Sequence, residues 1–200
     1  AALYAMARGE APLVVAAIDA AVQRCVPESV LLESAITLKT GESYPVEALT
    51  ARLTAAGYVR CQQVEGPGQF ALRGGILDVF SPAMEQPVRC EFWDDELDAM
   101  GAFDVTTQRR VHNLNETLLL PAGEVLPFRT ADTAEKAAAA LEAAGKKLKK
   151  KEHTEPLLRQ LESDANALRQ GIAPNGSDRY LAAVYPEKTT ALDYLPENAI

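Results

Sequence analysis

The sequence predicts a mixed α/β fold in which a mostly antiparallel sheet is followed by a helical C-terminal part. Strand signals recur from residue 58 to residue 120 with little helical periodicity. Beyond Pro127 the chain is rich in Ala, Glu and Lys, and its apolar residues return at helical spacing. With 200 residues, of which 48% are hydrophobic, the chain is large enough for one large or two small globular domains.

The first expected element is a buried parallel strand at Pro12–Ile18, PLVVAAI, because a strand that is covered on both faces is a continuous apolar run. Asp19 can cap the turn of helix that follows toward Cys25. The N-terminal part is therefore expected to contain one βα unit.

A strand and a helix are expected next. Ser34–Lys39 alternates apolar and polar residues, and Gly41 then interrupts the pattern. Ser43 can cap a helix over Pro45–Ala56, with proline at an early helical position and Gly57 at the C-terminal cap.

The following sixty residues predict a mostly antiparallel sheet, because short strand-like runs are separated by turn residues. The expected strands are Tyr58–Val64, Gln69–Leu72, Ile76–Phe80, Val88–Trp93, Leu97–Phe103 and Thr117–Leu120.

The C-terminal part predicts two helices, Thr133–Ala144 and Glu155–Gln170. GKKLKKK lies between them, and we expect its lysines, Lys146–Lys151, to lie in a solvated loop. The tail segments Tyr180–Tyr185 and Thr190–Leu195 are apolar enough to pack back on a core.

Composition limits the classes of partner. The 20 basic and 28 acidic side chains give a net charge of −8, which disfavours non-specific attraction to DNA. The sequence lacks an apolar run long enough to cross a membrane and a signal-peptide pattern, so no membrane partner and a cytoplasmic location are expected. Because the chain opens at Ala1 without an initiator Met, it is expected to be a fragment of a longer protein.

The sequence carries no signature of catalysis or of a cofactor. Cys25, Cys61 and Cys90 are widely spaced, and neither His112 nor His153 adds a zinc-binding spacing, so we expect no metal site. The phosphate loop G-x-x-x-x-G-K-[ST] and the nucleophile elbow G-x-S-x-G are both missing. We therefore expect no catalytic residues, no cofactor and no enzyme activity.

The acidic run Asp94, Asp95, Glu96 and Asp98 has two interpretations. Clustered carboxylates can hold Mg²⁺ in a nuclease. The run also joins two predicted strands, and adjacent carboxylates on a β-turn point apart. We favour the hairpin turn.

The segment Gly57–Phe80, GYVRCQQVEGPGQFALRGGILDVF, predicts a β-hairpin that carries cationic and aromatic groups but no catalytic machinery. Gly66–Gly68 is expected to form a turn, with Arg60 and Arg73 on strands near it. An arginine on a strand presents a rigid fork of donors to carboxylates or phosphates, and Phe70 could add an apolar anchor. The alternative is a surface arginine that pairs with Glu65 or Asp78. The pattern indicates docking.

The runs QVEGPGQFALRGGILDVFSP, PVRCEFWDDELDAMGAFDVTTQR and LLLPAGEVLP carry a resemblance to a known family. They are similar to the N-terminal UvrB-homologous region of bacterial transcription-repair coupling factors, and the closing ALDYLPENAI is similar to the end of that region. Trp93 and Asp94 depart from the commoner Phe-Gly form of the family's turn.

The resemblance implies a degenerate, helicase-like α/β domain with an inserted, mostly antiparallel α+β domain and a helical C-terminal part. It assigns residues 1–32 to part of a UvrB-like domain 1a, residues 33–122 to domain 2 and residues 123–200 to domain 1b. It also implies that domain 2 binds the repair protein UvrA, and that another domain of the parent can mask that surface. RNA polymerase and DNA would be reached only through the other domains of the parent, an ATP-dependent DNA translocase.

The resemblance places UvrA-contacting arginines at Arg60 and Arg73, with Gly74 beside the second and Phe70 at the matching aromatic position. Phe80 closes an apolar strand, so we expect it in the core and keep it as a weaker interface candidate.

Two alternatives remain open. A fragment of UvrB itself would share the hairpin pattern, but UvrB carries nucleotide-binding and helicase motifs that this sequence lacks. A DNA-binding module would use the lysine run 146–151, and its affinity for duplex DNA would fall steeply with salt.

Overall fold

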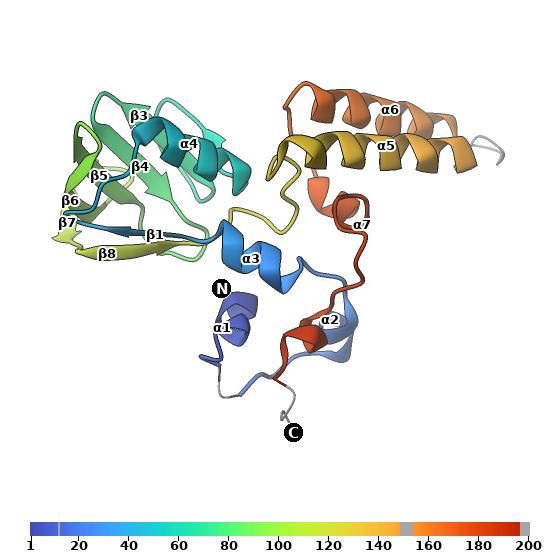
Figure 1. The fold of residues 1–200 in the computed structure, drawn as a ribbon, viewed down its shortest axis with the longest axis horizontal. Coiled ribbons are helices and arrows are strands. Elements are labelled where there is room, and N and C mark those ends of the chain that lie inside the picture. The colour runs from blue at the N-terminus through green and yellow to red at the C-terminus, as the bar shows by residue number, and fades with distance from the viewer. Residues whose placement is uncertain (12, 149–153, 197–200) are drawn as a thin grey trace. The chain divides into compact units, whose positions relative to one another are not determined.

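The computed structural model describes residues 1–11, 13–148 and 154–196 of the chain (Figure 1). The chain divides into two compact units. The first comprises Ser29–Gly123 together with Ala1, and the second comprises Ala2–Glu28 and Glu124–Ile200. Each unit has its own hydrophobic core.

Within the described residues, the first unit contains a six-stranded sheet with the order β2-β3-β4-β5-β6-β7. All neighbours from β3 to β7 are antiparallel, and each follows its predecessor along the chain. The mostly antiparallel sheet predicted from the sequence is therefore confirmed. The strands are β2 (Val59–Arg60), β3 (Gln69–Arg73), β4 (Ile76–Phe80), β5 (Val88–Trp93), β6 (Glu96–Phe103) and β7 (Arg110–Asn113).

Strand β2 departs from the prediction, which was wrong about a hairpin around Gly66–Gly68. Only Val59–Arg60 of the expected strand Tyr58–Val64 is extended, and it pairs with β3 in parallel. The loop between β2 and β3 brings the chain back beside the start of β2, so that the two strands run in the same direction. Within this loop, the side-chain oxygen of Gln69 accepts hydrogen bonds from the N–H groups of Glu65 and Gly66 at 2.8 and 3.1 Å. Strand β7 was not predicted, because all four of its residues are exposed and lack an apolar alternation.

Helix α4 (Val46–Ala55) lies over one face of this sheet (Figure 1). Leu49 and Leu53 join the core formed with residues of β3 to β6. Ser43 does not cap the helix as predicted, since it forms a bridge with Glu96 of β6. Instead the Val46 N–H donates to Oδ1 of Asp95 at 3.2 Å.

Two further strands complete the first unit. β1 (Ile36–Lys39) follows α3 (Glu28–Ser34) and pairs antiparallel with β8 (Glu116–Leu119). Ile36, Leu38 and Leu119 from this pair are almost fully buried in the same core as α4. The predicted alternation in this segment is therefore confirmed.

The second unit is mainly helical. α5 (Ala131–Leu148) and α6 (Glu155–Arg169) lie side by side (Figure 1) and share a core with residues that follow them. Its remaining elements are α1 (Ala2–Ala7), α2 (Ile18–Val22), η1 (Ser177–Tyr180), α7 (Leu181–Val184) and η2 (Ala191–Tyr194).

The predicted βα unit at the N-terminus is wrong. Residues 13–17 form no strand, and Leu13 and Val15 are 79% and 88% exposed; Pro12 lies outside the described residues. A strand needs a neighbour, and nothing in the described part of the chain pairs with this segment. The N-cap of α2 is Ala17, without a side-chain hydrogen bond, so Asp19 does not cap it.

Two lysines of the run lie in a helix, where the prediction of a loop is wrong. Lys146 and Lys147 belong to the last turn of α5, where a positive charge interacts favourably with the helix dipole. The other lysines of the run, Lys149–Lys151, lie outside the described residues. Among the helices that the structure describes, none is long and apolar enough to cross a membrane.

Candidate protein-docking surface

Arg73 ends β3 at the turn into β4, and its side chain is 46% exposed. One terminal nitrogen donates to Oδ2 of Asp78 at 2.9 Å, and the other donates to the carbonyl oxygen of Gln62 at 3.4 Å. The guanidinium is therefore held in place on one side while nearly half of the side chain faces solvent. The predicted pairing of an arginine with Asp78 is confirmed, and it does not remove Arg73 from the surface.

Asp78 is the centre of this arrangement, because its side chain is only 1% exposed and binds two arginines. Arg89 donates from Nε to Oδ1 at 2.7 Å and from Nη2 to Oδ2 at 2.9 Å. The same guanidinium lies 4.5 Å from the ring centroid of Phe103 and donates to Gln108. A buried carboxylate that is satisfied on both oxygens is a stable anchor for its partners.

The hydrogen bonds from Arg89 to Asp78 raise the pKa of the guanidinium above its ordinary value, although burial acts in the opposite direction. The group therefore stays charged. Strand register places Asp78 opposite Arg89, and Arg89 opposite Gly101, so all three lie on one face of the sheet.

The same face continues across β5 to β7. Glu91 forms an ion pair with Arg110, which also donates to Oδ1 of Asn113 at 3.0 Å. Gly101 lies beneath this arginine: a Cβ there would be 3.1 Å from its Cδ and 2.6 Å from the carbonyl oxygen of His112. The absence of a side chain lets Arg110 cross the sheet. We call Arg73, Asp78, Arg89, Glu91 and Arg110 the arginine face.

Arg60 is not part of that face. It pairs with Phe70 in the register of β2 and β3, so it lies on the same face as Phe70. Arg73 is three residues further along β3 and therefore lies on the opposite face. Arg60 is exposed and makes no hydrogen bond or ion pair with another described residue. The structure does not bring the two predicted arginines together.

The two phenylalanines are core residues. Phe70 is 1% exposed and packs in the core under α4, while Phe80 is 8% exposed and packs with Phe103. The prediction that Phe70 is an apolar anchor for a partner is therefore wrong, because its ring is buried in the folded chain. The core assignment of Phe80 is confirmed.

The two glycines of the β3–β4 turn differ. Gly74 has φ +58° and open space where a Cβ would lie. A Cβ on Gly75 would lie 2.6 Å from the carbonyl oxygen of Phe92, and the Phe92 N–H donates to the Gly75 carbonyl at 2.7 Å. Gly74 is available to a partner, whereas Gly75 permits contact between strands of the same sheet.

Asp94 and Asp95 form the predicted turn between β5 and β6, where Trp93 pairs with Glu96, while Glu96 and Asp98 of the acidic run belong to β6. Asp94 has φ +56°, and Asp95 caps α4. Within the described residues no group of three or more His, Cys, Asp or Glu side chains is arranged to hold a metal ion.

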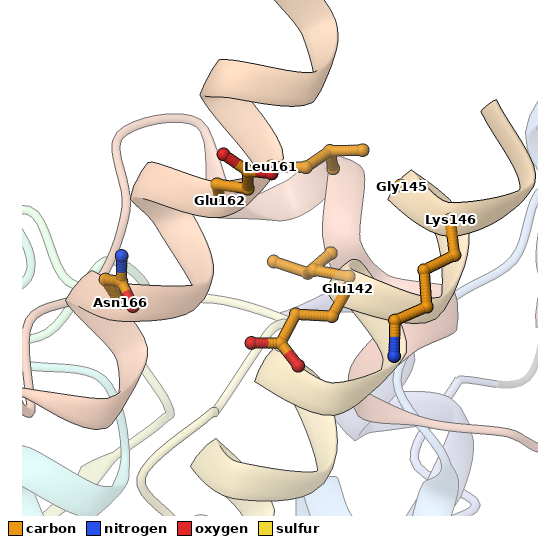
Figure 2. A pocket seen from close by; sticks show the side chains of 7 residues that line it. Glu142, Gly145, Lys146, Leu161, Glu162 and Asn166 are labelled. Carbon is orange, nitrogen blue, oxygen red and sulfur yellow. The ribbon is translucent and has the colours of Figure 1, made fainter. Parts of the chain in front are cut away.

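A pocket of about 320 Å³ lies between α5 and α6 in the second unit. Figure 2 shows Glu142 and Lys146 projecting from α5, and Glu162 and Asn166 from α6. Arg169 of α6 bonds to Glu142 at 2.6 Å beside it. The pocket is lined by residues at the contact between the two helices and by ordinary charged surface side chains. This lining does not indicate a catalytic or ligand-binding site.

Arg89, Glu91 and Arg110 were missed from the sequence, which offered Asp78 only as a pairing partner for a surface arginine. The available signal was Asp78 itself, a carboxylate inside the apolar strand ILDVF. Such a residue requires a cationic partner when it is buried. The sequence does not show which arginine supplies it.

Comparison with known proteins gives the family. Residues 36–124 match the family model of the UvrB interaction domain. A transcription-repair-coupling factor of Bacillus subtilis (strain 168) is 33% identical over 197 residues, which are 98% of this chain and 17% of that protein. Another, of Myxococcus xanthus, is 32% identical over 185 residues, or 92% of this chain and 15% of that protein. A third, of Escherichia coli (strain K12), is 35% identical over 122 residues, or 61% of this chain and 11% of that protein.

The chain thus spans at most 17% of the length of these curated relatives. The match to the domain family includes the whole six-stranded sheet and the arginine face. The chain is a relative of the transcription-repair-coupling factors that contains a UvrB interaction domain at residues 36–124.

Proposed function

We propose that this chain is a non-catalytic docking module that recruits the excision-repair protein UvrA to stalled transcription complexes. The observation that carries the proposal is the geometry of Arg73, which is 46% exposed yet anchored on a carboxylate that is 1% exposed. The family of residues 36–124 supports a role in repair coupled to transcription.

The physical argument concerns preorganisation. A free surface arginine loses much rotamer freedom when a partner binds it, whereas Arg73 is already held by Asp78 and Gln62. Its remaining N–H donors can meet a carboxylate of the partner in a planar fork. The arginine face sets three arginines against the two carboxylates of Asp78 and Glu91, so it keeps an excess of positive charge and an acidic surface of UvrA is the expected counterpart.

The wider assignments belong to the same proposal. Residues 1–32 and 123–200 correspond to parts of UvrB-like domains 1a and 1b, and residues 33–122 correspond to domain 2. In the parent protein another domain can cover the arginine face until RNA polymerase has been displaced. RNA polymerase and DNA are contacted by other domains, and the protein acts in the cytoplasm.

The test is calorimetric titration of UvrA with the chain and with Arg73→Glu. We expect Arg73→Ala to weaken binding by about 2–4 kcal/mol and Arg73→Glu by more, because a desolvated arginine at an interface is a typical hot spot. In Arg73→Ala, Asp78 keeps both bonds from Arg89, so the free energy of unfolding should change by only about 0.5 kcal/mol. Arg73→Glu brings a second carboxylate near Asp78 and should be less stable, so a thermal melt checks that this variant is folded.

Arg52→Glu is the matched control. It makes the same change of charge at an exposed position of α4, on the side of the sheet opposite Arg73. Equal binding by wild type and a folded Arg73→Glu would disprove docking through the arginine face. Equal weakening by Arg52→Glu would show that only net charge matters.

A further inference from the structure

The first unit has a second surface of different chemistry, a hollow of about 630 Å³ at one end of the sheet. It lies between the β3–β4 turn at Gly74–Gly75, the β5–β6 turn at Asp94–Asp95 and the first turn of α4. Leu72 and Arg73 are consecutive in β3 and point to opposite faces, so this hollow and the arginine face share the β3–β4 turn but open on different sides.

The lining of the hollow is apolar at its centre. Val46, Leu72 and Phe92 are each partly exposed there, and Trp93 stands beside them with 82% of its surface exposed. A single exposed apolar residue is ordinary on a protein surface. A tryptophan next to three half-covered apolar side chains in a concavity is typical of a contact site, because burying an indole releases much apolar surface from water.

The rim is acidic. Glu47 and Asp94 are exposed, and no hydrogen bond or ion pair engages either carboxylate within the described part of the chain. Asp95 is occupied, since its side chain caps α4 and its carbonyl accepts the Tyr44 N–H at 2.7 Å. Among the residues that the structure describes, no basic side chain lines the hollow. Its charge is thus the reverse of the arginine face.

We propose that this hollow binds a protein segment in which a lysine or arginine lies next to an apolar side chain. The apolar side chain packs on Leu72 and Phe92, and the cation lies against the indole of Trp93 within reach of Glu47 and Asp94. Cations are attracted to the face of tryptophan more strongly than to other rings, and two unpaired carboxylates add to that attraction. This proposal is independent of UvrA binding, because that interaction uses the opposite charge on another face.

The test uses Trp93 as its own reporter, since the chain contains one tryptophan. A capped pentapeptide that alternates lysine and leucine is titrated into the chain while the emission is recorded. Because the bound peptide covers the exposed indole and removes water from it, the emission should shift to shorter wavelength in a saturable way. Matched peptides with glutamate for lysine, or serine for leucine, should bind at least tenfold more weakly.

The double variant Glu47→Gln, Asp94→Asn keeps the shape of the hollow, and asparagine tolerates the positive φ of residue 94. It should weaken the lysine–leucine peptide at least tenfold, while Arg73→Glu leaves that affinity unchanged. UvrA binding is measured separately. If the peptide fails to bind while UvrA binds, the hollow proposal has failed; if UvrA fails to bind while the peptide binds, the docking proposal has failed.

Three results would overturn the proposal. One is an unshifted emission up to millimolar peptide, and another is equal binding of the glutamate peptide. The third is a blue shift that grows with protein concentration alone and coincides with dimer formation in sedimentation, which would make a second copy of the chain the occupant.

Discussion

Asp78 occupies a strand position at which its neighbours are apolar, and its carboxylate is nevertheless almost completely buried. The charge is tolerated because Arg89 binds both oxygens and Arg73 binds one of them. At the scale of single residues, the exposed Arg73 is therefore positioned by a side chain that is itself almost completely buried.

We predict that Asp78→Asn destabilises the chain by about 3–5 kcal/mol, since it removes the counter-charge of a half-buried Arg89. The control is Glu91→Gln, whose ion pair with Arg110 is exposed and should contribute less than about 1 kcal/mol. Urea unfolding of both variants makes the comparison. Equal effects would mean that Asp78 does not anchor the arginine face.

At the scale of elements, the β3–β4 hairpin depends on its second glycine. The turn brings Gly75 against the backbone of β5, where the register between Glu91 and Phe92 shifts. The close contact sets the position of the turn and hence of Arg73.

Gly75→Ala should destabilise the chain by about 1–3 kcal/mol, because its Cβ would lie 2.6 Å from a backbone oxygen that has to move. Gly66→Ala is the control, with no atom within 4 Å of its Cβ and an ordinary φ, and should change stability by less than about 0.5 kcal/mol. Thermal melts of the two variants decide the matter. A neutral Gly75→Ala would show that the two strands are further apart than described.

In the helical unit, Asp164 of α6 links three neighbours. Its carboxylate accepts hydrogen bonds from Gln160 at 2.8 Å, from Arg179 at 2.7 Å and from the Tyr180 hydroxyl. Burial opposes ionisation, but these hydrogen bonds outweigh it and lower the pKa of Asp164 below its ordinary value of 3.8.

A carboxylate with a lowered pKa stabilises the folded state above its unfolded pKa, and this contribution is lost as the pH falls through the folded pKa. Asp164→Asn should therefore reduce helix stability at pH 7, and the difference from wild type should shrink below about pH 4. Circular dichroism melts across pH measure it, with the exposed Asp178→Asn as control. A difference that does not vary with pH would contradict the assigned role of the charge.

At the scale of the whole molecule, the cysteines report on the two units separately. Cys25 belongs to the second unit and Cys90 to the first, and both are buried. Burial raises the pKa of the Cys25 thiol to about 11 and that of Cys90 to about 12. Cys61 is only partly buried, and its pKa is raised as well.

We expect a thiol reagent at pH 8 to modify Cys61 first, and Cys25 and Cys90 only as each unit opens, because the thiolate is the reacting form. Variants that retain one cysteine each, followed by mass spectrometry over time, separate the three rates. Rapid labelling of Cys90 would contradict the sheet core, and rapid labelling of Cys25 would contradict the packing of the second unit.

The sequence by itself determined the elements whose signals are local. Strand-like runs predicted β1 and the strands from β3 to β6, a composition rich in Ala, Glu and Lys predicted α5, and helical spacing predicted α6. The β5–β6 turn at Asp94–Asp95 followed from its position between two strands. These features depend on backbone preferences and on apolar periodicity within a few residues, so they are present in the sequence itself.

Only the tertiary structure decided what depends on distant partners. It paired β2 in parallel with β3, left residues 13–17 without a strand partner, buried Phe70 and placed Arg60 and Arg73 on opposite faces. It also brought Arg89 to Asp78, eleven residues away along the chain. Strand register determines which side chains share a face of the sheet. A side chain becomes buried only when separate segments of the chain pack around it.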